Sequence, residues 1–417
     1  MHEAILATVS SSASAEREAA ALRRLRESFP VLRDAAYLNA GTDGPLPVQA
    51  IQAAGEVLAR AGRLGRGREH FELRRQLSEQ LREAYAASLS CDAGEVALTS
   101  CTTEGLAIVL EGLDLSPGDE ILTSDEEHPG LLGPLAAAQQ LAGVRVRLAP
   151  FQRIAEAISS ETKLIACSHV SWMTGRVCPA ELADVDVPLL LDGAQGVGAV
   201  PVEVKELRCS AYAGAGQKWL CGPDGVGMLY VCPELRERIS VRRRGYMNLL
   251  DPGAGLQARL QQDARRFDAL ALSAETLACA LAAWRVLNEA GWGLVHRRAM
   301  RLAARLAALL AASGRRVVGR EGAAAGHEDA SSAAPEGAEA TDREGAESAG
   351  PERGETAFAE GSTLVTFESP HPERERAELE EASVILRDIP GRPWLRASVG
   401  AWNDEQDLQR LLAALQA

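Results

Sequence analysis

Short apolar runs alternate with helical patterns through the first two thirds of the chain. The runs are nearly continuous in apolar residues, and most are followed by a stretch with helical periodicity; they occupy residues 96–98, 120–122, 144–148, 164–168, 189–191 and 226–231. The helices that follow are predicted to begin at Thr103, at Gly130, near Ile154 and near Ala180. Such alternation is typical of a mostly parallel sheet covered by helices on both faces.

The two ends of the chain follow other patterns. Residues 15–28 have helix-forming composition, residues 37–39 form a short predicted strand, and residues 41–45 break it into a loop. Two further helices are expected over residues 48–64 and 70–89, and a strand over residues 362–367.

Residues 321–357 contain no Leu, Ile, Val, Met or aromatic residue, so they cannot bury enough surface to offset the entropy of ordering. We therefore expect an α/β protein in three parts. A helical segment covers residues 1–36, a large domain covers 37–285, and a smaller α+β domain covers 286–417. This smaller domain, joined by part of the N-terminal segment, is interrupted by a disordered acidic insertion over residues 321–357.

Composition excludes several classes of protein. The 417 residues are 46% hydrophobic and 24% charged, which is ordinary for a soluble globular protein. The net charge of −14 argues against a nucleic-acid surface, although residues 321–355 alone carry −8 of it. The eight cysteines show no CxxC pairing and no metal-ligand spacing, which favours reduced thiols and no metal site. No signal peptide and no bilayer-spanning run are predicted, so we expect a cytoplasmic protein.

Lys218 is the most informative residue. It lies in a turn of small residues, and Asp192 ends an apolar run 26 positions earlier. This pair suits pyridoxal 5'-phosphate (PLP), because a lysine amine forms a Schiff base with that cofactor while a carboxylate keeps its pyridine nitrogen protonated. Taken alone, each residue is also explained as a surface lysine and a turn-forming aspartate.

Three more loops follow predicted strands. Thr102 and Thr103 open a helix whose free N–H groups favour an anion such as phosphate, although a threonine there is also an ordinary helix cap. His128 could lie flat on a cofactor ring or be a surface histidine, and residues 168–175 form the third loop. Ligands of open parallel sheets bind at the carboxyl ends of strands, which places all these loops at one edge.

These motifs resemble the class V aminotransferase family of fold-type I PLP enzymes, which includes cysteine desulfurases, isopenicillin-N epimerase-like proteins and cystine C–S lyases. The similarity runs from about Tyr37 to the C-terminus, excluding the insertion. It is densest in Glu127-His128-Pro129-Gly130, Ser168-His169-x-x-Trp172-x-Thr174-Gly175, Asp192-Gly193-Ala194-Gln195 and Gln217-Lys218-Trp219.

The resemblance implies a role for each matching residue. Lys218 would form the Schiff base, Asp192 would pair with the pyridine nitrogen, and His128 would stack on the ring. Further cofactor contacts are expected from Thr102, Thr103, Gln195 and Gln217, and substrate contacts from Arg396, Arg387 and Asn39. Arg396 matches the arginine that binds the α-carboxylate of the substrate, and Arg387 resembles a second arginine of the cystine-lyase branch.

The chain departs from the family pattern near the phosphate. Ala215 and Gln217 replace the Ser or Thr and the His that many relatives carry. Ala271, with Ser273 nearby, replaces a threonine expected from the partner subunit of a homodimer. We therefore expect fewer side-chain donors around the phosphate and modest cofactor affinity.

The expected function is a PLP enzyme acting on an α-amino acid, by amino transfer or by cleavage of a C–S bond. Alternatives are an amino-acid epimerase, a cysteine desulfurase and a degenerate, non-enzymatic PLP-binding scaffold. The desulfurase is less favoured, because a persulfide-forming cysteine is needed on a C-terminal loop and no cysteine follows Cys279.

Overall fold

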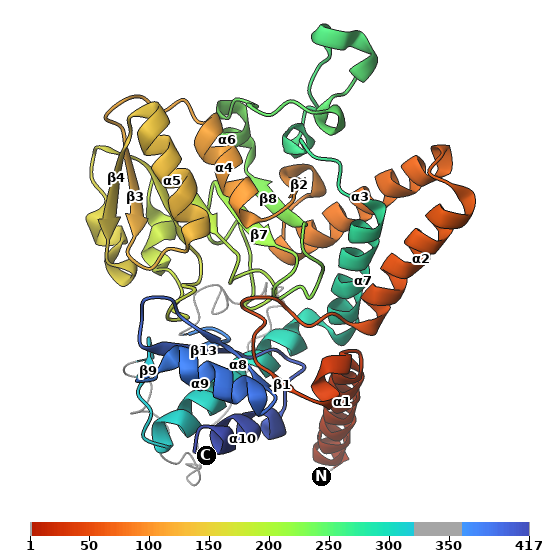
Figure 1. The fold of residues 1–417 in the computed structure, drawn as a ribbon, viewed down its shortest axis with the longest axis vertical. Coiled ribbons are helices and arrows are strands. Elements are labelled where there is room, and N and C mark those ends of the chain that lie inside the picture. Colours follow the sequence, from red (N-terminus) through yellow and green to blue (C-terminus); the bar gives the residue numbers. More distant parts are fainter. Residues whose placement is uncertain (1, 321–360, 417) are drawn as a thin grey trace, which may run out of the picture.

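A computed structural model of the protein describes residues 2–320 and 361–416 (Figure 1). The predicted disordered insertion therefore lies outside the described residues. Among the helices within these ranges, none combines the length and the apolar character needed to cross a membrane.

The large domain is built on a seven-stranded sheet in the order β2-β8-β7-β6-β5-β3-β4. Its strands are β2 (Val96–Thr99), β3 (Glu120–Ser124), β4 (Arg145–Ala149), β5 (Thr162–Ser168), β6 (Leu189–Asp192), β7 (Ala211–Ala215) and β8 (Gly227–Val231). β8 runs antiparallel to both of its neighbours, and the other neighbouring pairs are parallel. This confirms the mostly parallel sheet predicted from the apolar runs.

Both faces of the sheet are buried, as the continuous apolar strands require. In β5, Ile165 and Cys167 belong to one hydrophobic cluster while Leu164 and Ala166 belong to another. Successive strand residues point to opposite faces, so one strand contributes to two cores. The helices α4 (Thr102–Gly112) and α5 (Pro129–Ala142) pack against each other beside the sheet (Figure 1).

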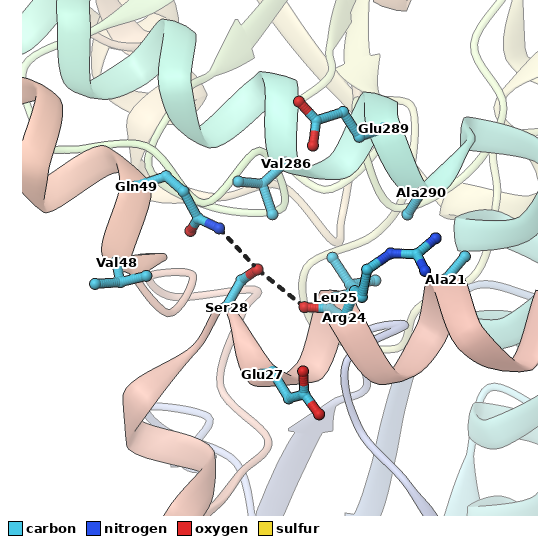
Figure 2. A pocket seen from close by; sticks show the side chains of 10 residues that line it. All are labelled: Ala21, Arg24, Leu25, Glu27, Ser28, Val48, Gln49, Val286, Glu289 and Ala290. Carbon is cyan, nitrogen blue, oxygen red and sulfur yellow. Dashed lines mark hydrogen bonds between the residues drawn. The ribbon is translucent and has the colours of Figure 1, made fainter.

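A helical group stands at the other side of the large domain. The helices α2 (Val48–Leu64) and α3 (Arg68–Leu89) project away from the sheet, and α7 (Ala274–Ala290) packs against both (Figure 1). The N-terminal helix α1 (His2–Glu27) ends close to the start of α2. There Ser28 accepts a hydrogen bond from Gln49 Nε2 at 3.1 Å, beside a polar cavity of about 310 Å³ (Figure 2).

The smaller domain has an antiparallel sheet in the order β12-β13-β10-β9. Its strands are β9 (Val317–Val318), β10 (Leu364–Glu368), β12 (Arg387–Asp388) and β13 (Trp394–Ser398), and its helices are α8 (Trp292–Ala312), α9 (Pro372–Glu381) and α10 (Glu405–Ala414). β1 (Ala36–Tyr37), from the start of the chain, pairs in parallel with β11 (Val384–Ile385) near its end. This pairing ties the N-terminal segment to the smaller domain.

Two details differ from the sequence-based expectation. The helices predicted near Ile154 and Ala180 are short 3₁₀ turns at Phe151–Arg153, Ala155–Ala157 and Ala180–Asp184. β7 was not among the predicted strands; only its last two residues, Gly214 and Ala215, belong to the predicted turn of small residues that carries Lys218. Its five residues are all buried, and its neighbours β6 and β8 supply the pairing that its small residues do not encode locally.

The helix α6 (Pro233–Arg238) follows β8 and leads to an arm that runs through residues 239–273. This arm projects beyond the sheet in the same general direction as α2 and α3 (Figure 1).

Candidate functional site

A cavity of about 250 Å³ lies where the carboxyl ends of the large-domain strands meet the smaller domain. Its lining combines loops from both domains: Gly41, Thr42, Asp43, Cys101, Thr102, Thr103, His128, Gly130, Trp172, Asp192, Ala194, Gln195, Ala215, Gln217, Lys218, Arg387 and Arg396. Nine of the ten residues singled out in the sequence for cofactor or substrate line it. Asn39 is the exception, because it lies just before the lining segment, in a bridge with Ser398.

The turn that carries Lys218 is held by close backbone contacts. Gly44 N donates to Gln217 O at 2.7 Å, and Cys221 N donates to Lys218 O at 3.0 Å. A Cβ atom on Gly44 would lie 2.0 Å from Lys218 O, so only glycine allows the loop of residues 41–45 to approach. Burial lowers the pKa of Lys218 to about 8, with Asp192 acting in the opposite direction.

Asp192 ends β6 beside Lys218. Its side chain is buried, and Oδ1 accepts a hydrogen bond from Ala194 N at 2.9 Å. Burial raises the pKa of Asp192, and Lys218 opposes that rise. The residue after Asp192 must be a glycine, because a Cβ atom on Gly193 would lie 1.9 Å from the Tyr212 ring. A buried carboxylate so placed is stabilised by a cationic partner in the cavity.

Gln195 connects the two sides of the cavity. Its Oε1 accepts from Trp219 Nε1 at 3.0 Å, and its Nε2 donates to Gly41 O at 2.7 Å. The amide thus links the loop after β6 to the turn around Lys218 and to the N-terminal loop. Gln195 therefore holds these three segments together, whereas the sequence analysis expected only a contact with the cofactor.

Trp172 contacts both His128 and Arg387 along one wall of the cavity. The His128 and Trp172 rings meet edge to face with centroids 4.9 Å apart, and the Arg387 guanidinium carbon lies 5.6 Å from the Trp172 centroid. His128 Nδ1 accepts from Gly130 N at 3.0 Å, so Nε2 carries the proton of the neutral ring. Burial and the nearby cations Lys218, Arg387 and Arg396 lower the pKa of His128 to about 4. The ring is therefore neutral near pH 7.

The first turn of α4 forms the end of the cavity nearest Cys101. Thr102 Oγ1 is buried and has no hydrogen-bond partner among the residues that the structure describes. Thr103 Oγ1 lies close to Gly130, where a Cβ atom would be 2.7 Å from it. A helix N-terminus with free N–H groups and hydroxyls favours an anion.

Two arginines face the cavity from the smaller domain. Arg387 and Arg396 lie directly opposite each other on the antiparallel strands β12 and β13. Arg396 is fully buried; its Nη1 donates to Trp172 O at 2.6 Å and its Nη2 to Thr42 Oγ1 at 3.4 Å. Burial, and then repulsion by Arg387, lower the pKa of Arg396 to about 9. A desolvated guanidinium of this kind is a strong site for a carboxylate.

The residues that the sequence analysis placed near the phosphate have different surroundings in the structure. Gln217 Oε1 is buried without a partner in the described part of the chain. Ala271 and Ser273 do not line the cavity; Ser273 Oγ instead caps α7 by accepting from Thr276 N at 3.2 Å. The protein supplies Thr102, Thr103 and Gln217 as polar side chains at this end.

Sequence reasoning missed three contributors. Trp172 was quoted only as part of a motif, and Asp43 only as part of a loop. Glu127 was quoted beside His128 without a role, yet its buried carboxylate accepts from Ser168 N at 3.0 Å and Ser168 Oγ at 2.6 Å. Nothing in the local pattern marks Glu127, because Asp125 and Glu126 stand before it and His128 after it, and none of these three is buried.

Comparison with known proteins adds a family and a set of relatives. Residues 36–333 match the family model described as aminotransferase class-V. The chain is 29% identical over 243 residues to a probable cysteine desulfurase of Methanothermobacter thermautotrophicus, covering 54% of this chain and 60% of the relative. It is 30% identical over 220 residues to the isopenicillin N epimerase of Streptomyces clavuligerus, covering 48% and 54%. The matched part thus spans between half and two thirds of these curated relatives.

Solved structures match over more of the chain. A variant of the protein C-DES with glycine covalently linked to its PLP cofactor superposes with a TM-score of 0.78 and 26% identity. The match covers 94% of this chain and 98% of that one. Another structure is that of the cystine C–S lyase C-DES with its product cysteine persulfide, with a TM-score of 0.77 and 26% identity over 93% and 98% of the two chains.

The fold, the loops gathered at the carboxyl ends of its strands and the match over residues 36–333 lead to one assignment. The chain belongs to the aminotransferase class-V family.

Proposed function

We propose that this protein is a PLP-dependent enzyme that acts on an α-amino acid and cleaves a C–S bond by β-elimination. The observation that carries this proposal is the convergence of Lys218, Asp192 and the two arginines on one cavity. The lysine and aspartate suit the cofactor, and Arg396 suits the carboxylate of an amino acid. The structural likeness to the cystine C–S lyase C-DES supports the choice of reaction.

The lining residues fit PLP. Thr102 Oγ1 is a buried hydroxyl without a partner in the described chain, at a helix N-terminus that suits the phosphate. Asp192 is a buried carboxylate whose charge calls for a protonated partner, as the pyridine nitrogen would be. When bound, PLP supplies an aldehyde that captures amines and a ring that accepts electrons. Lys218 would hold the aldehyde carbon, and His128 would cover one face of the ring.

Each protein group then has a defined task. Arg396 would bind the α-carboxylate of the substrate, and Lys218 would be the group that accepts the α-proton. With its pKa near 8, the Lys218 amine is neutral in about a tenth of molecules near pH 7, and this neutral form can take up that proton. The neutral His128 imidazole would pack against the cofactor ring without adding a charge to the site. Loss of a sulfur leaving group from the β-carbon requires no further protein nucleophile.

A cysteine desulfurase would need such a nucleophile. That reaction transfers sulfur to a protein thiol close to the substrate. Cys101 lines the cavity as the N-cap of α4, next to Thr102, and is not on the C-terminal loop where that reaction's cysteine is expected. No cysteine follows Cys279 in the sequence. We therefore favour release of a small sulfur product over transfer of sulfur to the enzyme.

Product analysis tests the proposal. Purified protein loaded with PLP is incubated with L-cystine, L-cysteine and a panel of other amino acids, with and without a 2-oxo acid. We expect pyruvate and ammonia in equal amounts, together with a sulfur-containing product, and no need for the 2-oxo acid. A strict requirement for the 2-oxo acid, with transfer of the amino group to it, would instead identify an aminotransferase. Lys218→Ala protein treated identically is the control for uncatalysed breakdown.

A further inference from the structure

Glu126 anchors the loop of residues 171–176, although it does not itself line the cavity. It follows β3, and 13% of its side chain is exposed. Its Oε2 accepts from the hydroxyls of Ser171 and Thr174, the latter at 2.6 Å. Its Oε1 accepts from Arg176 Nη1 at 3.4 Å. One carboxylate thus receives three hydrogen bonds from a segment that lies 45 to 50 positions further along the chain.

The two hydroxyls connect this carboxylate to the backbone of the loop. Ser171 Oγ accepts from Met173 N at 3.3 Å and from Thr174 N at 3.2 Å. Thr174 Oγ1 in turn accepts from Arg176 N at 3.3 Å. Each hydroxyl has a single hydrogen to donate, and Glu126 accepts both. A hydroxyl that donates to a carboxylate is a better acceptor, so the hydrogen bonds of the loop strengthen one another.

Two carbonyl groups of the same loop accept hydrogen bonds from the smaller domain. Trp172 O accepts from Arg396 Nη1 at 2.6 Å. Met173 O accepts from Thr366 Oγ1, also at 2.6 Å. Thr366 and Arg396 lie opposite each other on β10 and β13, and both are fully buried. The conformation of the loop therefore determines where these two strands meet the cavity.

The bond to Trp172 O is the contact that orients the Arg396 guanidinium. In the part of the chain that the structure describes, Arg396 Nε is buried without a partner, and Nη2 reaches only Thr42 Oγ1, at 3.4 Å. A guanidinium binds a carboxylate through two parallel N–H groups, so the plane of the guanidinium has to be fixed. A shift of the loop would move Trp172 O and leave this plane undefined.

We propose that Glu126 is a positioning residue for the carboxylate of the substrate. It acts through the loop of residues 171–176 on Arg396, without contact to substrate or cofactor. The contacts lead from the Glu126 carboxylate through two hydroxyls to the loop backbone, and then from Trp172 O to Arg396 Nη1. This inference rests on the proposed function only for the assignment of the α-carboxylate to Arg396.

Two amines that have no leaving group on the β-carbon separate this role from the proposed reaction. L-Alanine carries an α-carboxylate, and ethylamine is the same molecule without it. Titration of the PLP-loaded protein with each amine, followed by the absorbance of the cofactor, gives two dissociation constants. Glu126→Gln keeps the size of the side chain and removes its charge and one of its two acceptor oxygens. We expect this variant to bind L-alanine about tenfold more weakly and ethylamine less than about twofold more weakly.

A double variant shows whether the effect passes through Arg396. In the Arg396→Ala background, Glu126→Gln should change the dissociation constant of L-alanine less than about twofold, because the group that it positions is gone. Asp125→Asn is the matched control. Asp125 also follows β3 and accepts from Phe151 N at 2.9 Å, but neither residue lines the cavity. Its replacement should leave the ratio of the two dissociation constants unchanged.

Thr174→Val provides a second route to the same measurement if Glu126→Gln protein does not fold. It replaces the hydroxyl that donates to Glu126 by a methyl group, and it should weaken L-alanine selectively by about threefold. Thermal unfolding of each variant identifies those that are folded.

The outcomes are distinguishable. Equal weakening of both amines, no weakening of either, or the same tenfold effect in the Arg396→Ala background would overturn the positioning role of Glu126. If Arg396→Ala protein bound L-alanine as tightly as the wild type, the carboxylate site and this inference would both be wrong. The expected ratios in a protein that releases no pyruvate from any amino acid would retain the positioning role and refute only the proposed lyase reaction.

Discussion

At the scale of single residues, the cavity depends on charges taken out of water. Lys218, Asp192 and Arg396 each carry a pKa displaced in the direction that burial dictates. Each displacement is moderated or increased by a neighbour, since Asp192 favours the charged lysine and Arg387 disfavours the charged arginine. Perturbed groups of this kind gather where a ligand is to be bound or a proton moved.

Replacement of Lys218 by alanine should abolish turnover and leave the fold intact. The amine is the group proposed to hold the cofactor and to move the α-proton, and general-base catalysis alone contributes about 10²- to 10⁴-fold. We expect turnover at saturating substrate to fall by at least about a thousandfold. Substantial remaining turnover would show that another residue does this work. An unchanged thermal unfolding transition checks that the variant is folded.

Capture of the cofactor by the apoprotein should depend on pH through Lys218. Only the neutral amine attacks an aldehyde, and burial lowers the pKa of Lys218 from 10.5 to about 8. The rate of PLP incorporation, followed by absorbance after mixing, should therefore rise with pH and level off above about pH 8. A rate that keeps rising to pH 10 would show that the lysine titrates like an exposed one.

Asp192→Asn protein should bind PLP and lose most of its rate. A neutral amide of the same size keeps the packing at the end of β6, but it cannot hold a proton on the pyridine nitrogen. Cofactor content and turnover are measured on the same preparation. Turnover equal to that of the wild type would contradict the role proposed for this carboxylate.

Arg396→Ala should raise the apparent KM for α-amino acids by at least about tenfold and lower kcat through misorientation. A carboxylate entering a partly dry cavity loses hydration and needs a charged partner. Simple amines that lack a carboxylate serve as the comparison, and their reaction with the bound cofactor should change far less. Equal damage to both kinds of amine would mean that Arg396 acts by supporting the fold, through its bond to Trp172 O.

At the scale of elements, Glu127 connects two strands beneath the cavity. Its carboxylate accepts from Ser124 Oγ at the end of β3 and from Ser168 N and Oγ at the end of β5. The backbone pairing of β3 with β5 ends at Leu122 and Ile165. Beyond these residues, the hydrogen bonds of Glu127 hold the two strands together. His128 and His169 follow directly on the two connected segments. A buried carboxyl thus fixes the edge from which several site residues extend.

Glu127 predicts a dependence of stability on pH. Burial raises the pKa of Glu127 from 4.5 to about 7, so the folded state binds this proton more tightly than the unfolded state. The stabilisation is complete below about pH 4.5 and is lost as the pH rises through about 7, with a total near 3 kcal/mol. Free energies of unfolding of the wild type and of Glu127→Gln are compared across this range. Their difference should shift in favour of the variant as the pH rises, and a constant difference would refute the assignment.

At the scale of the whole molecule, the site belongs to neither domain alone. The large domain supplies Lys218, Asp192 and His128, and the smaller domain supplies Arg387 and Arg396. Hydrogen bonds join the two domains beside the site, among them Arg396 Nη1 to Trp172 O and Thr366 Oγ1 to Met173 O, both at 2.6 Å. Motion between the domains would therefore change the distance between the groups proposed to bind cofactor and substrate.

Removal of residues 321–355 should leave activity unchanged. The flanks of this segment lie together, because the Arg320 guanidinium donates to Ser362 O and, at 3.4 Å, to Leu364 O. Residues 356–360 remain as a linker, and the shorter connection should leave stability unchanged or raise it by at most about 2 kcal/mol. The deletion also removes a net charge of −8. Activity and denaturant unfolding are measured on both proteins, and loss of soluble protein would reveal a structural role.

The sequence by itself determined the sheet and the edge at which ligands bind. Continuous apolar runs can be buried only by a sheet covered on both faces, and parallel strands bring the loops that follow them to one edge. Lys218, Asp192, His128 and the two threonines were therefore identifiable from local motifs. β7 was not, because its small residues carry no strand pattern and are held by neighbours distant in the sequence.

Only the tertiary structure decided which groups share the cavity. Asp43 and Arg387 are 344 positions apart in the sequence, and nothing local to either one indicates the other. The tertiary structure also assigned Gln195 its bonds to Trp219 and Gly41, and it placed Asn39 outside the cavity lining. The physical reason is common to all of these. Local sequence governs backbone conformation and burial, whereas pairing between distant polar side chains depends on how the two domains pack.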